Sequence, residues 1–275
     1  MEGKIRERRD GRVETLARGL SLLVAFGEGG GGKTLTELAR AAGLPKPTAM
    51  RMLRTLEEFG FVSREGRLYH VGPRCLSLGN LYDLDEDLRC WSLPVMRELT
   101  QKVGEVVQLA VLKGREILYL ERTEPRRSVT VVLSRPGSTR PAHCTALGKA
   151  LLAFGGEKER EEYLAVDRLE SRTSRSITSP EALRAELEVT RERGYAVDDT
   201  ESDEEVRCVA APIFDGEGRC IAAMSVSAPA YRLPEERQAA LGALVREYAG
   251  RVTHTYGSKC VDRSKNPRTT AKEQK

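Results

Sequence analysis

The stretch TLTELARAAGLPKPTAMRMLRTLEEFG, residues 34–60, indicates two helices joined by a tight turn. Gly43 separates the helices, and Pro47 is tolerated because it stands in the first turn of the second helix. Apolar residues share one face of each helix: Leu38, Ala39 and Ala42 in the first, and Met52, Leu53, Leu56 and Phe59 in the second. The segment that follows, residues 61–72, alternates around a turn as a two-stranded wing does. The pattern predicts a winged helix-turn-helix.

The opposite face of the second helix is polar and cationic. In a helix-turn-helix the N-terminal part of this helix enters the major groove of DNA. Arg51 can then form a bidentate contact with guanine, and Thr48 can touch a base edge or a thymine methyl group. A solvated helix face explains any one arginine as well, but the whole ensemble favours DNA. The expected DNA-binding residues are Lys46, Thr48, Arg51, Arg54, Thr55, Arg64 and Arg67, with Lys46, Arg64 and Arg67 on phosphates.

Immediately upstream, GEGGGGKT at residues 27–34 matches the phosphate-loop pattern G-x-x-x-x-G-K-[ST]. A phosphate loop requires a preceding strand, so that a helix opens toward the phosphates. The preceding apolar residues instead follow a 3.6-residue period: Val13, Leu16, Ala17, Leu20, Leu23 and Val24. This period favours a helix followed by a flexible connection. A nucleotide-dependent enzyme that uses Gly32, Lys33 and Thr34 stays open as the rival interpretation.

The composition indicates a two-domain protein with basic ends. The chain has 275 residues and a net charge of +4. Residues 1–72 carry 13 Lys and Arg against 9 Asp and Glu, residues 257–275 carry 6 against 2, and the middle carries 26 against 30. Only the ends are therefore expected to approach a polyanion. The six cysteines lack CxxC spacing and the three histidines lie far apart, so neither disulfides nor a metal site is expected. With no membrane span and no signal-peptide core, we expect a cytoplasmic protein.

Several segments resemble one known family along residues 13–256. LTELARAAGLPKPTAMRMLRTLEEFGFVSREGRLYHVGPRCLSLG is similar to the winged helix-turn-helix of the IclR family of bacterial transcriptional regulators. STRPAHCTALGKALLAF and VRCVAAPIFDGEGRCIAAMSVSAPAYRL are similar to parts of the ligand-binding domain of that family. One departure lies at Met50, which cannot donate the hydrogen bond that the family often makes there with His or Tyr. The operator sequence is therefore expected to differ.

The resemblance implies an α+β fold: an N-terminal winged helix-turn-helix joined by a linker helix to a GAF-like effector-binding domain with a central antiparallel sheet. A helical pattern from Pro73 to about Lys102, with a break expected near Pro94, is consistent with a linker. The expected divisions are a disordered N-terminus at 1–12, the DNA-binding domain at 13–72, the linker helix at 73–90, the effector-binding domain at 91–256 and a disordered basic tail at 257–275.

A helix beginning near Thr145 offers its N-terminal N–H groups and dipole as an anion site. The resembled family binds small organic acids at the equivalent place. The expected effector-binding residues are Ala146, Leu147, Asp198, Cys208 and Arg140. In these roles Asp198 accepts a hydrogen bond from a ligand hydroxyl, and Cys208 forms a small wall of the site. For Arg140, an ordinary surface arginine is an equally good explanation. The other acidic residues between 199 and 205 are expected to be solvated. His143 and Cys144 lack a third partner for a metal or for nucleophilic catalysis.

The expected function is a ligand-responsive DNA-binding transcriptional regulator, a repressor or an activator, and not an enzyme. It would need no cofactor. Partners would be double-stranded DNA at a near-palindromic operator, a small carboxylate or related metabolite, and further copies of the chain in a homodimer or homotetramer. Besides the nucleotide-dependent enzyme, a constitutive DNA-binding protein with an empty sensor domain remains an alternative, and it predicts DNA binding that no metabolite changes.

Overall fold

The computed structural model describes residues 13–27, 31–79, 86–125 and 134–264, with side chains up to residue 256. The chain divides into two compact units, residues 1–83 and 84–275. Five expected segments fall wholly or partly outside the described residues: the N-terminus at 1–12, the glycine-rich connection at 28–30, residues 80–85 of the linker helix, most of SVTVVLS at 128–134, whose alternation indicates a strand, and the tail at 265–275.

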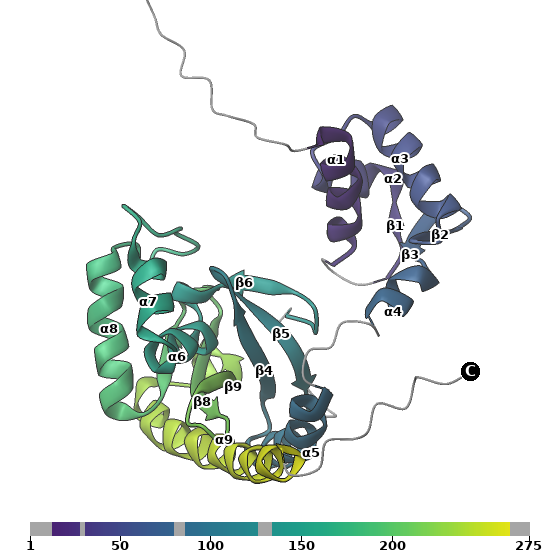
Figure 1. The fold of residues 1–275 in the computed structure, drawn as a ribbon. Coiled ribbons are helices and arrows are strands. Elements are labelled where there is room, and N and C mark those ends of the chain that lie inside the picture. Colours follow the sequence, from purple (N-terminus) through teal and green to yellow (C-terminus); the bar gives the residue numbers. More distant parts are fainter. Residues whose placement is uncertain (1–12, 28–30, 80–85, 126–133, 265–275) are drawn as a thin grey trace, which may run out of the picture. The chain divides into compact units, whose positions relative to one another are not determined.

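The N-terminal unit is a winged helix-turn-helix, as predicted (Figure 1). Its elements are α1 (Glu14–Val24), η1 (Ala25–Gly27), β1 (Lys33–Thr34), α2 (Leu35–Ala41), α3 (Lys46–Glu58), β2 (Val62–Glu65), β3 (Leu68–Val71) and α4 (Pro73–Gly79). The three strands form an antiparallel sheet in the order β1-β3-β2. Gly43 between α2 and α3 has φ 61° and Gly66 at the tip of the wing has φ 59°, so both turns use the left-handed conformation that favours glycine.

A small apolar core holds this unit together. Its buried residues include Leu22 of α1, Leu38 of α2 and Leu53 of α3, with Val62 and Tyr69 from the wing. Phe59, which we expected on the apolar face of α3, is instead 61% exposed. Phe59 lies two helical turns after Met52, which is only half-buried, and so points to the edge of the core, away from the fully buried Ala49 and Leu53.

The C-terminal unit is a six-stranded antiparallel sheet with helices on both faces, which confirms the predicted α+β class (Figure 1). Its elements are α5 (Glu86–Val103), β4 (Val106–Lys113), β5 (Glu116–Thr123), β6 (Thr139–Pro141), η2 (Ala142–Cys144), α6 (Ala146–Phe154), α7 (Glu157–Leu164), α8 (Pro180–Arg193), β7 (Ala196–Asp199), β8 (Val206–Phe214), β9 (Cys220–Pro229), η3 (Ala230–Arg232) and α9 (Glu235–Ser264). The strand order is β6-β5-β4-β9-β8-β7. Helices α5 and α9 cover one face of the sheet, and α6 covers the other, with α7 and α8 outside it.

Two helices of this unit depart from the expected boundaries. Helix α5 continues through Pro94, so the break expected there is wrong. Leu88 and Met96, on either side of the proline, are both buried against the sheet, and this packing holds α5 as one helix. Helix α5 also crosses the linker boundary expected at residue 90, and α9 runs past residue 256 to Ser264. None of the helices that the structure describes combines the length and the apolar composition that a membrane span requires.

Candidate DNA-binding surface and effector site

The outer face of α3 presents its cations to solvent. Lys46, Arg51 and Arg54 are exposed, and within the described part of the chain none of them pairs with a carboxylate. Thr55 donates a hydrogen bond from Oγ1 to the carbonyl of Arg51 at 3.3 Å, and Thr48 is half-buried. The structure therefore places the five predicted residues of α3 on one helix, with the cations free to meet phosphates or base edges.

The two predicted wing residues differ in how firmly they are held. Arg64 donates from Nε to the carbonyl of Gly66 at 3.0 Å, and its guanidinium lies 5.4 Å from the centre of the Tyr69 ring. Arg67 is exposed at the start of β3. Arg64 is thus braced against the wing, whereas the side chain of Arg67 extends into solvent.

A groove of about 360 Å³ runs between α1 and the outer face of α3. It is lined by Thr15, Arg18, Thr48, Arg51, Met52 and Thr55. Thr15 and Arg18 were not predicted to lie beside the recognition helix, because the period of α1 indicated only a packing helix. Their spacing of three residues places both on one face of α1, and this was the available signal. Arg18 pairs with Glu14 at 3.1 Å.

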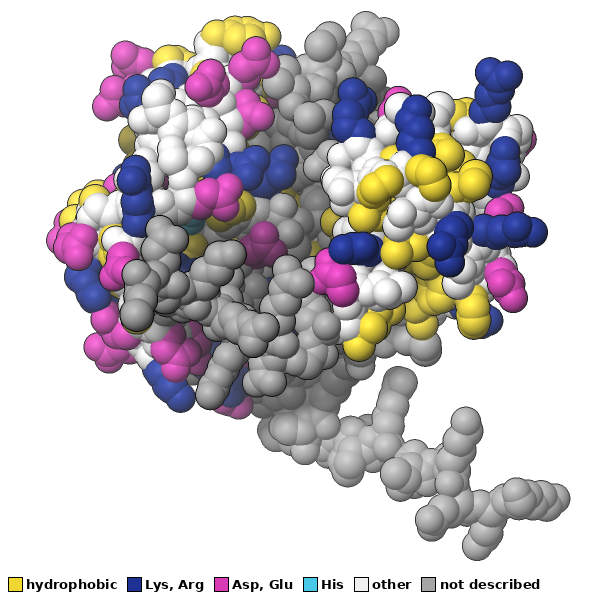
Figure 2. All heavy atoms as spheres, turned by 90° about the horizontal axis from the view of Figure 1, so that it is seen from above, with side chains coloured by type: hydrophobic (Ala, Val, Ile, Leu, Met, Phe, Trp, Pro, Cys, Tyr) yellow, Lys and Arg dark blue, Asp and Glu magenta, His cyan; other side chains and the backbone are white. Residues whose placement is uncertain are grey.

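Another face of α1 is apolar and exposed. Val13, Leu16, Leu20 and Val24, which are spaced by three or four residues, are 52–74% exposed. Figure 2 shows hydrophobic side chains gathered on the N-terminal unit with Lys and Arg side chains around them. The 3.6-residue period that predicted α1 therefore belongs largely to side chains that the core does not cover. Exposed apolar residues that form a continuous stripe typically mark an interaction surface.

The structure does not provide the context of a phosphate loop around GEGGGGKT. The element before it is helix α1 and not a strand, and Lys33 and Thr34 themselves form β1, paired with Tyr69 and Leu68. The hydroxyl of Thr34 accepts a hydrogen bond from the N–H of Glu37 at 3.3 Å, while the carboxylate of Glu37 accepts from the N–H of Thr34 at 2.7 Å. This capping box starts α2 and occupies the threonine that a phosphate loop would use on a metal ion.

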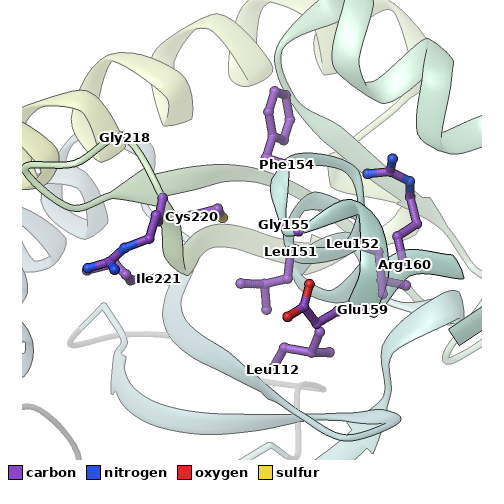
Figure 3. Close-up of a pocket in the computed structure, with 12 residues that line it drawn as sticks. Leu112, Leu151, Leu152, Phe154, Gly155, Glu159, Arg160, Gly218, Cys220 and Ile221 are labelled. Atoms are coloured by element: carbon purple, nitrogen blue, oxygen red, sulfur yellow. The ribbon is translucent and has the colours of Figure 1, made fainter. Parts of the chain in front are cut away.

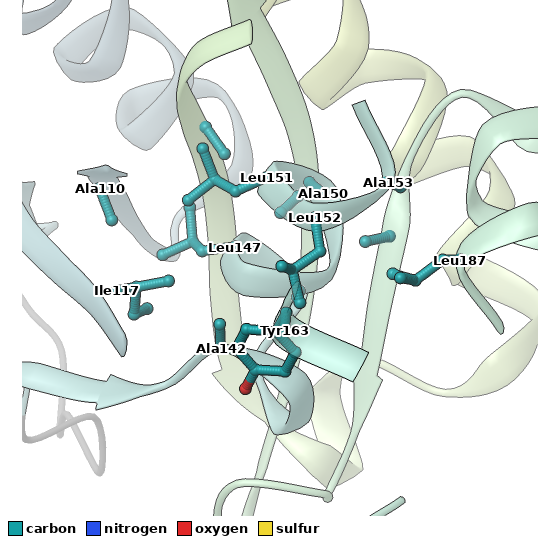
Figure 4. Packing of buried hydrophobic residues seen from close by; sticks show 14 of the residues in the cluster. Ala110, Ile117, Ala142, Leu147, Ala150, Leu151, Leu152, Ala153, Tyr163 and Leu187 are labelled. Atoms are coloured by element: carbon teal, nitrogen blue, oxygen red, sulfur yellow. The ribbon is translucent and has the colours of Figure 1, made fainter. Parts of the chain in front are cut away.

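In the C-terminal unit, the sheet face under α6 has an apolar half. Alternate residues of the strands lie on this face, and Ala110, Ala210 and Ala223 pack with Ala146, Leu147 and Ala150 of α6. Figure 4 shows Ala110 and Ile117 of the sheet near Leu147 and Leu151 of the helix. The small side chains of the strands allow α6 to lie close to the sheet.

The other half of the same face is polar. The polar residues are Gln108, Asp198, Cys208 and Ser225. Each stands two positions along its strand from an alanine of the apolar half, and Ser227 stands two positions beyond Ser225. Gln108, Asp198, Ser225 and Ser227 are each at most 2% exposed. The hydroxyl of Ser227 lies 2.9 Å from Gln108 Oε1 and 3.0 Å from Cys208 Sγ, and Gln108 Nε2 donates to the hydroxyl of Ser134.

One member of this polar half lacks a hydrogen-bond partner. Ser225 is 0% exposed, and among the described residues nothing bonds to its Oγ. A buried hydroxyl without a partner is rare in folded proteins and calls for an additional group, such as a water molecule, an ion or a ligand. The sequence analysis missed Gln108, Ser225 and Ser227. The signal was present in β9, where serines alternate with Met224 and Val226 in an otherwise apolar strand.

The N-terminus of α6 is tightly packed. Thr145 caps the helix by accepting a hydrogen bond from the N–H of Gly148 at 3.0 Å. A Cβ atom at Gly148 would lie 2.1 Å from the carbonyl oxygen of Ala142, so glycine is required at this close approach. The N–H groups of Ala146 and Leu147 precede the first intrahelical hydrogen bonds and are the helix end that favours an anion.

Electrostatic effects indicate that four titratable groups lie near one another. Burial raises the pKa of the Asp198 carboxyl to about 7. Burial also raises the pKa of Tyr119, Cys144 and Cys208, and the negative charge of Asp198 raises each of them further. Asp198 pairs with Cys208 across β7 and β8, and its negative charge acts on groups of β5 and of the turn that precedes α6.

The hydrogen bonds of Asp198 go to its own loop. Oδ1 accepts from the N–H groups of Glu201 at 2.7 Å and Ser202 at 3.3 Å, and Oδ2 accepts from the hydroxyl of Ser202 at 2.6 Å. The acidic residues after Asp198 are not all solvated, contrary to expectation. Glu201 is 6% exposed and Asp199 pairs with Arg175 and Arg207, while residues 203–205 are exposed.

Two other predicted positions have clear surroundings. Arg140 pairs with Ile117 across β5 and β6 and is half-buried, and its positive charge offsets part of the rise in the pKa of Tyr119. His143 Nδ1 lies 3.2 Å from the hydroxyl of Tyr163, and Nε2 lies 2.8 Å from the carbonyl of Glu170. Both ring nitrogens of His143 are thus engaged within the fold.

A separate groove of about 540 Å³ opens at the C-terminal end of α6 (Figure 3). It is lined by Leu112, Leu151, Phe154 and Cys220 among others, with the charged residues Glu159, Arg160 and Arg219. None of the predicted effector residues lines it. It therefore serves as an internal reference for experiments on the other end of the helix.

Comparison with known proteins covers both units. A family model described as the IclR helix-turn-helix domain matches residues 15–66, and one described as the bacterial transcriptional regulator IclR C-terminal domain matches residues 84–254. The transcriptional repressor IclR of Escherichia coli (strain K12) is 36% identical over 252 residues, which cover 90% of this chain and 91% of the relative.

Solved structures agree. The crystal structure of the Thermotoga maritima IclR is 31% identical, with a TM-score of 0.69 over 90% of this chain and 100% of that chain. An IclR homolog from Microbacterium hydrocarbonoxydans complexed with 4-hydroxybenzoate is 30% identical, with a TM-score of 0.71 over 89% and 100%. These proteins are transcriptional regulators and not enzymes, so the nucleotide-dependent enzyme is the wrong interpretation of GEGGGGKT. The chain belongs to the IclR family of bacterial transcriptional regulators.

Proposed function

We propose that the protein responds to a small organic acid, which binds between the N-terminus of α6 and the polar half of the large sheet. The buried hydroxyl of Ser225, without a partner among the described residues, carries this proposal. The helix end supplies N–H groups and a favourable dipole for a carboxylate. Arg140 and Asp198 lie near the same position and suit a second polar group of the ligand.

The relative from Microbacterium hydrocarbonoxydans supports an acid of this class, because that protein is complexed with 4-hydroxybenzoate. Such a ligand combines a carboxylate with a hydroxyl group at the far side of an apolar ring. In this chain a carboxylate would meet the N–H groups of Ala146 and Leu147, with Cys208 as a small wall of the site. The ligand would change DNA binding only if it binds one arrangement of the protein better than another.

For the DNA-binding unit we propose that α3 enters the major groove. Arg51 and Thr48 would contact bases, and Lys46, Arg64 and Arg67 would contact phosphates. Arg54 and Thr55 extend the same face along the helix. Thr15 and Arg18 of α1 would add contacts at the edge of the groove that they share with α3.

We further propose that the protein acts as a homodimer or homotetramer on a near-palindromic operator. The exposed apolar stripe of α1, formed by Val13, Leu16, Leu20 and Val24, supports self-association, since pairing with the same stripe of a second copy would bury it. Leu16→Glu with Leu20→Glu should weaken association and operator binding together. Sedimentation velocity and a DNA titration would measure both, and an unchanged oligomeric state would show that another surface pairs the copies.

Thermal unfolding against a panel of small carboxylates, including 4-hydroxybenzoate, tests the effector site. An acid at about 100 times its dissociation constant should add about 2.7 kcal/mol to stability. ATP and GTP serve as controls and should give no shift. Operator binding that no panel acid alters, together with no thermal shift, would favour a constitutive DNA-binding protein.

A matched pair of variants then locates the site. Ser225→Ala should reduce the affinity for the stabilising acid by about 0.5–1.5 kcal/mol, the net value of one hydrogen bond. It should not lower the melting temperature of the free protein, because it removes a hydroxyl that has no partner. Cys220→Ala, in the groove at the other end of α6, should leave the affinity unchanged. The reverse pattern would place the ligand in that groove.

A further inference from the structure

Lys149 is a buried cation in the middle of α6. Only 1% of its surface is exposed, and burying an ammonium group is unfavourable unless carboxylates compensate for the lost hydration. Its Nζ lies 2.5 Å from Glu201 Oε1 and 3.6 Å from Glu186 Oε1. Glu201 belongs to the loop after β7 and Glu186 to α8. One buried charge thus joins α6, α8 and the loop that follows Asp198.

That loop has an unfavourable backbone conformation. Thr200 has φ 59°, in the left-handed region that β-branched residues rarely adopt. Two side-chain hydroxyls hold it: Thr173 donates to the carbonyl of Thr200 at 2.8 Å, and Ser176 donates to the carbonyl of Glu201 at 2.7 Å. Backbone strain of this kind persists where the surroundings over-determine it, and it occurs frequently at ligand sites.

Glu201 connects the loop to both sides of the effector site. Its N–H donates to Asp198 Oδ1 at 2.7 Å, while its side chain pairs with Lys149. Lys149 stands one helical turn after Ala146, at which α6 begins. The pair therefore links the carboxylate of Asp198 with the N-terminus of α6, and a shift of Glu201 would change their separation.

The charges in this region make Lys149 hard to replace. Glu186 also pairs with Arg193 at 2.7 Å, whereas among the described residues Lys149 is the one cation that forms an ion pair with Glu201. Glu201 Oε2 is buried without a partner among the described residues. Without Lys149, the buried carboxylate of Glu201 would lose its ion-pair partner while the N–H of Glu201 still bonds to Asp198 Oδ1.

We propose that Lys149 and Glu201 are a pair of positioning residues for the effector site: they set the affinity for the acid without touching it, by fixing Asp198 relative to the N-terminus of α6. The inference rests on the effector site proposed above. It assigns a role to two residues that the sequence analysis did not select, one in the core of α6 and one in an acidic run.

Amide hydrogen exchange on the full-length protein tests the pairing without any ligand. In Lys149→Met the amides of Glu201 and Ser202 should exchange at least tenfold faster, with the amides of β4 and β9 unchanged. Glu201→Gln retains an acceptor for Lys149 and should give a smaller increase. Glu204→Gln, an exposed position in the same acidic run, is the matched control and should exchange like the wild type.

Affinity provides the second readout. The dissociation constant for 4-hydroxybenzoate, or for whichever panel acid gives the largest thermal shift, should rise at least tenfold in Lys149→Met and less in Glu201→Gln. Operator affinity in the absence of acid should stay the same in all three variants, which a merely structural role would not predict.

Three outcomes would overturn the inference: loop exchange equal to that of the wild type, exchange that accelerates throughout the sheet, or an unchanged affinity for the acid. If Lys149→Met does not fold, the Glu201→Gln variant tests the inference. The inference then requires that its loop amides exchange faster than those of Glu204→Gln. A wild-type protein that no panel acid stabilises would overturn the effector site itself. The exchange result would then still show whether Lys149 and Glu201 hold the loop.

Discussion

The outer face of α3 and the polar half of the large sheet satisfy their polar groups in opposite ways. On α3, Lys46, Arg51 and Arg54 face solvent without carboxylate partners in the described chain. On the sheet, Gln108 and Ser227 are buried and bond to each other, and Ser227 also bonds to Cys208. A change on the exposed face should therefore alter DNA binding with little effect on stability, whereas a change that removes a bonded partner in the buried site should alter stability and acid binding.

The largest expected effect is a loss of stability at Gly148, where the C-terminal unit is closely packed. Gly148→Ala should destabilise this unit by about 3 kcal/mol or more, because the new Cβ would lie 2.1 Å from the carbonyl oxygen of Ala142. Gly19 of α1 is the matched control in the N-terminal unit, since a Cβ there meets nothing within 4 Å. Gly19→Ala should stabilise by about 0.5–1 kcal/mol through helix propensity. Calorimetry of both variants measures the two effects.

The comparison would fail if the two alanine variants unfolded alike. A Gly148→Ala protein of normal stability would mean that α6 and the turn before it can separate. The N-terminus of α6 would then not be the rigid anion site that the proposed function requires.

On the exposed side, Arg51 and Lys46 should separate base reading from phosphate binding. Arg51→Ala should weaken specific operator binding by about 1–3 kcal/mol and relax the preference at one base pair. Lys46→Ala should weaken binding to all sequences about equally and reduce the slope of log affinity against log salt by about 1. The free energy of unfolding of both variants should stay within about 0.5 kcal/mol of that of the wild type. Titrations with operator and random DNA at several salt concentrations distinguish the two roles.

The N-terminal unit could be predicted in detail because its signals are local. The helix-turn-helix, Gly43, Pro47 and the wing stand within one stretch of the sequence, and each acts on its neighbours. Even so, the period of α1 could not show that Val13, Leu16, Leu20 and Val24 face outward, since periodicity identifies an apolar face but not what covers it.

The effector site was only partly predictable because it is assembled across strands. Asp198 and Cys208 came from the resemblance, and the sheet register places them opposite each other on β7 and β8. Ser225 and Lys149 could not be selected, because their significance lies in a missing hydrogen bond and in a buried ion pair. Both depend on residues far apart in the sequence. The solvated loop expected after Asp198 was wrong at Glu201 for the same reason.

The buried site should also show a pH dependence that the α3 face lacks. Burial raises the pKa of Asp198 from 3.8 to about 7, and the hydrogen bond from Ser202, which favours the carboxylate, offsets this only in part. Because the folded protein holds this proton more tightly than the unfolded chain does, the group favours folding most below pH 4, and this contribution is lost as the pH rises to about 7.

Wild-type stability should therefore fall relative to that of Asp198→Asn between pH 5 and pH 7, by up to about 1.4 kcal/mol per pH unit, and should run parallel to it above pH 8. Urea unfolding of both proteins across this range measures the difference, and carboxylates that do not interact with Asp198 cancel in it. Arg51→Ala is the control from the exposed face and should parallel the wild type throughout. If Asp198→Asn also runs parallel from pH 5, then Asp198 is ionised throughout that range, and solvent or a counter-charge reaches the polar half of the sheet. The buried site would then resemble the α3 face more closely than the packing indicates.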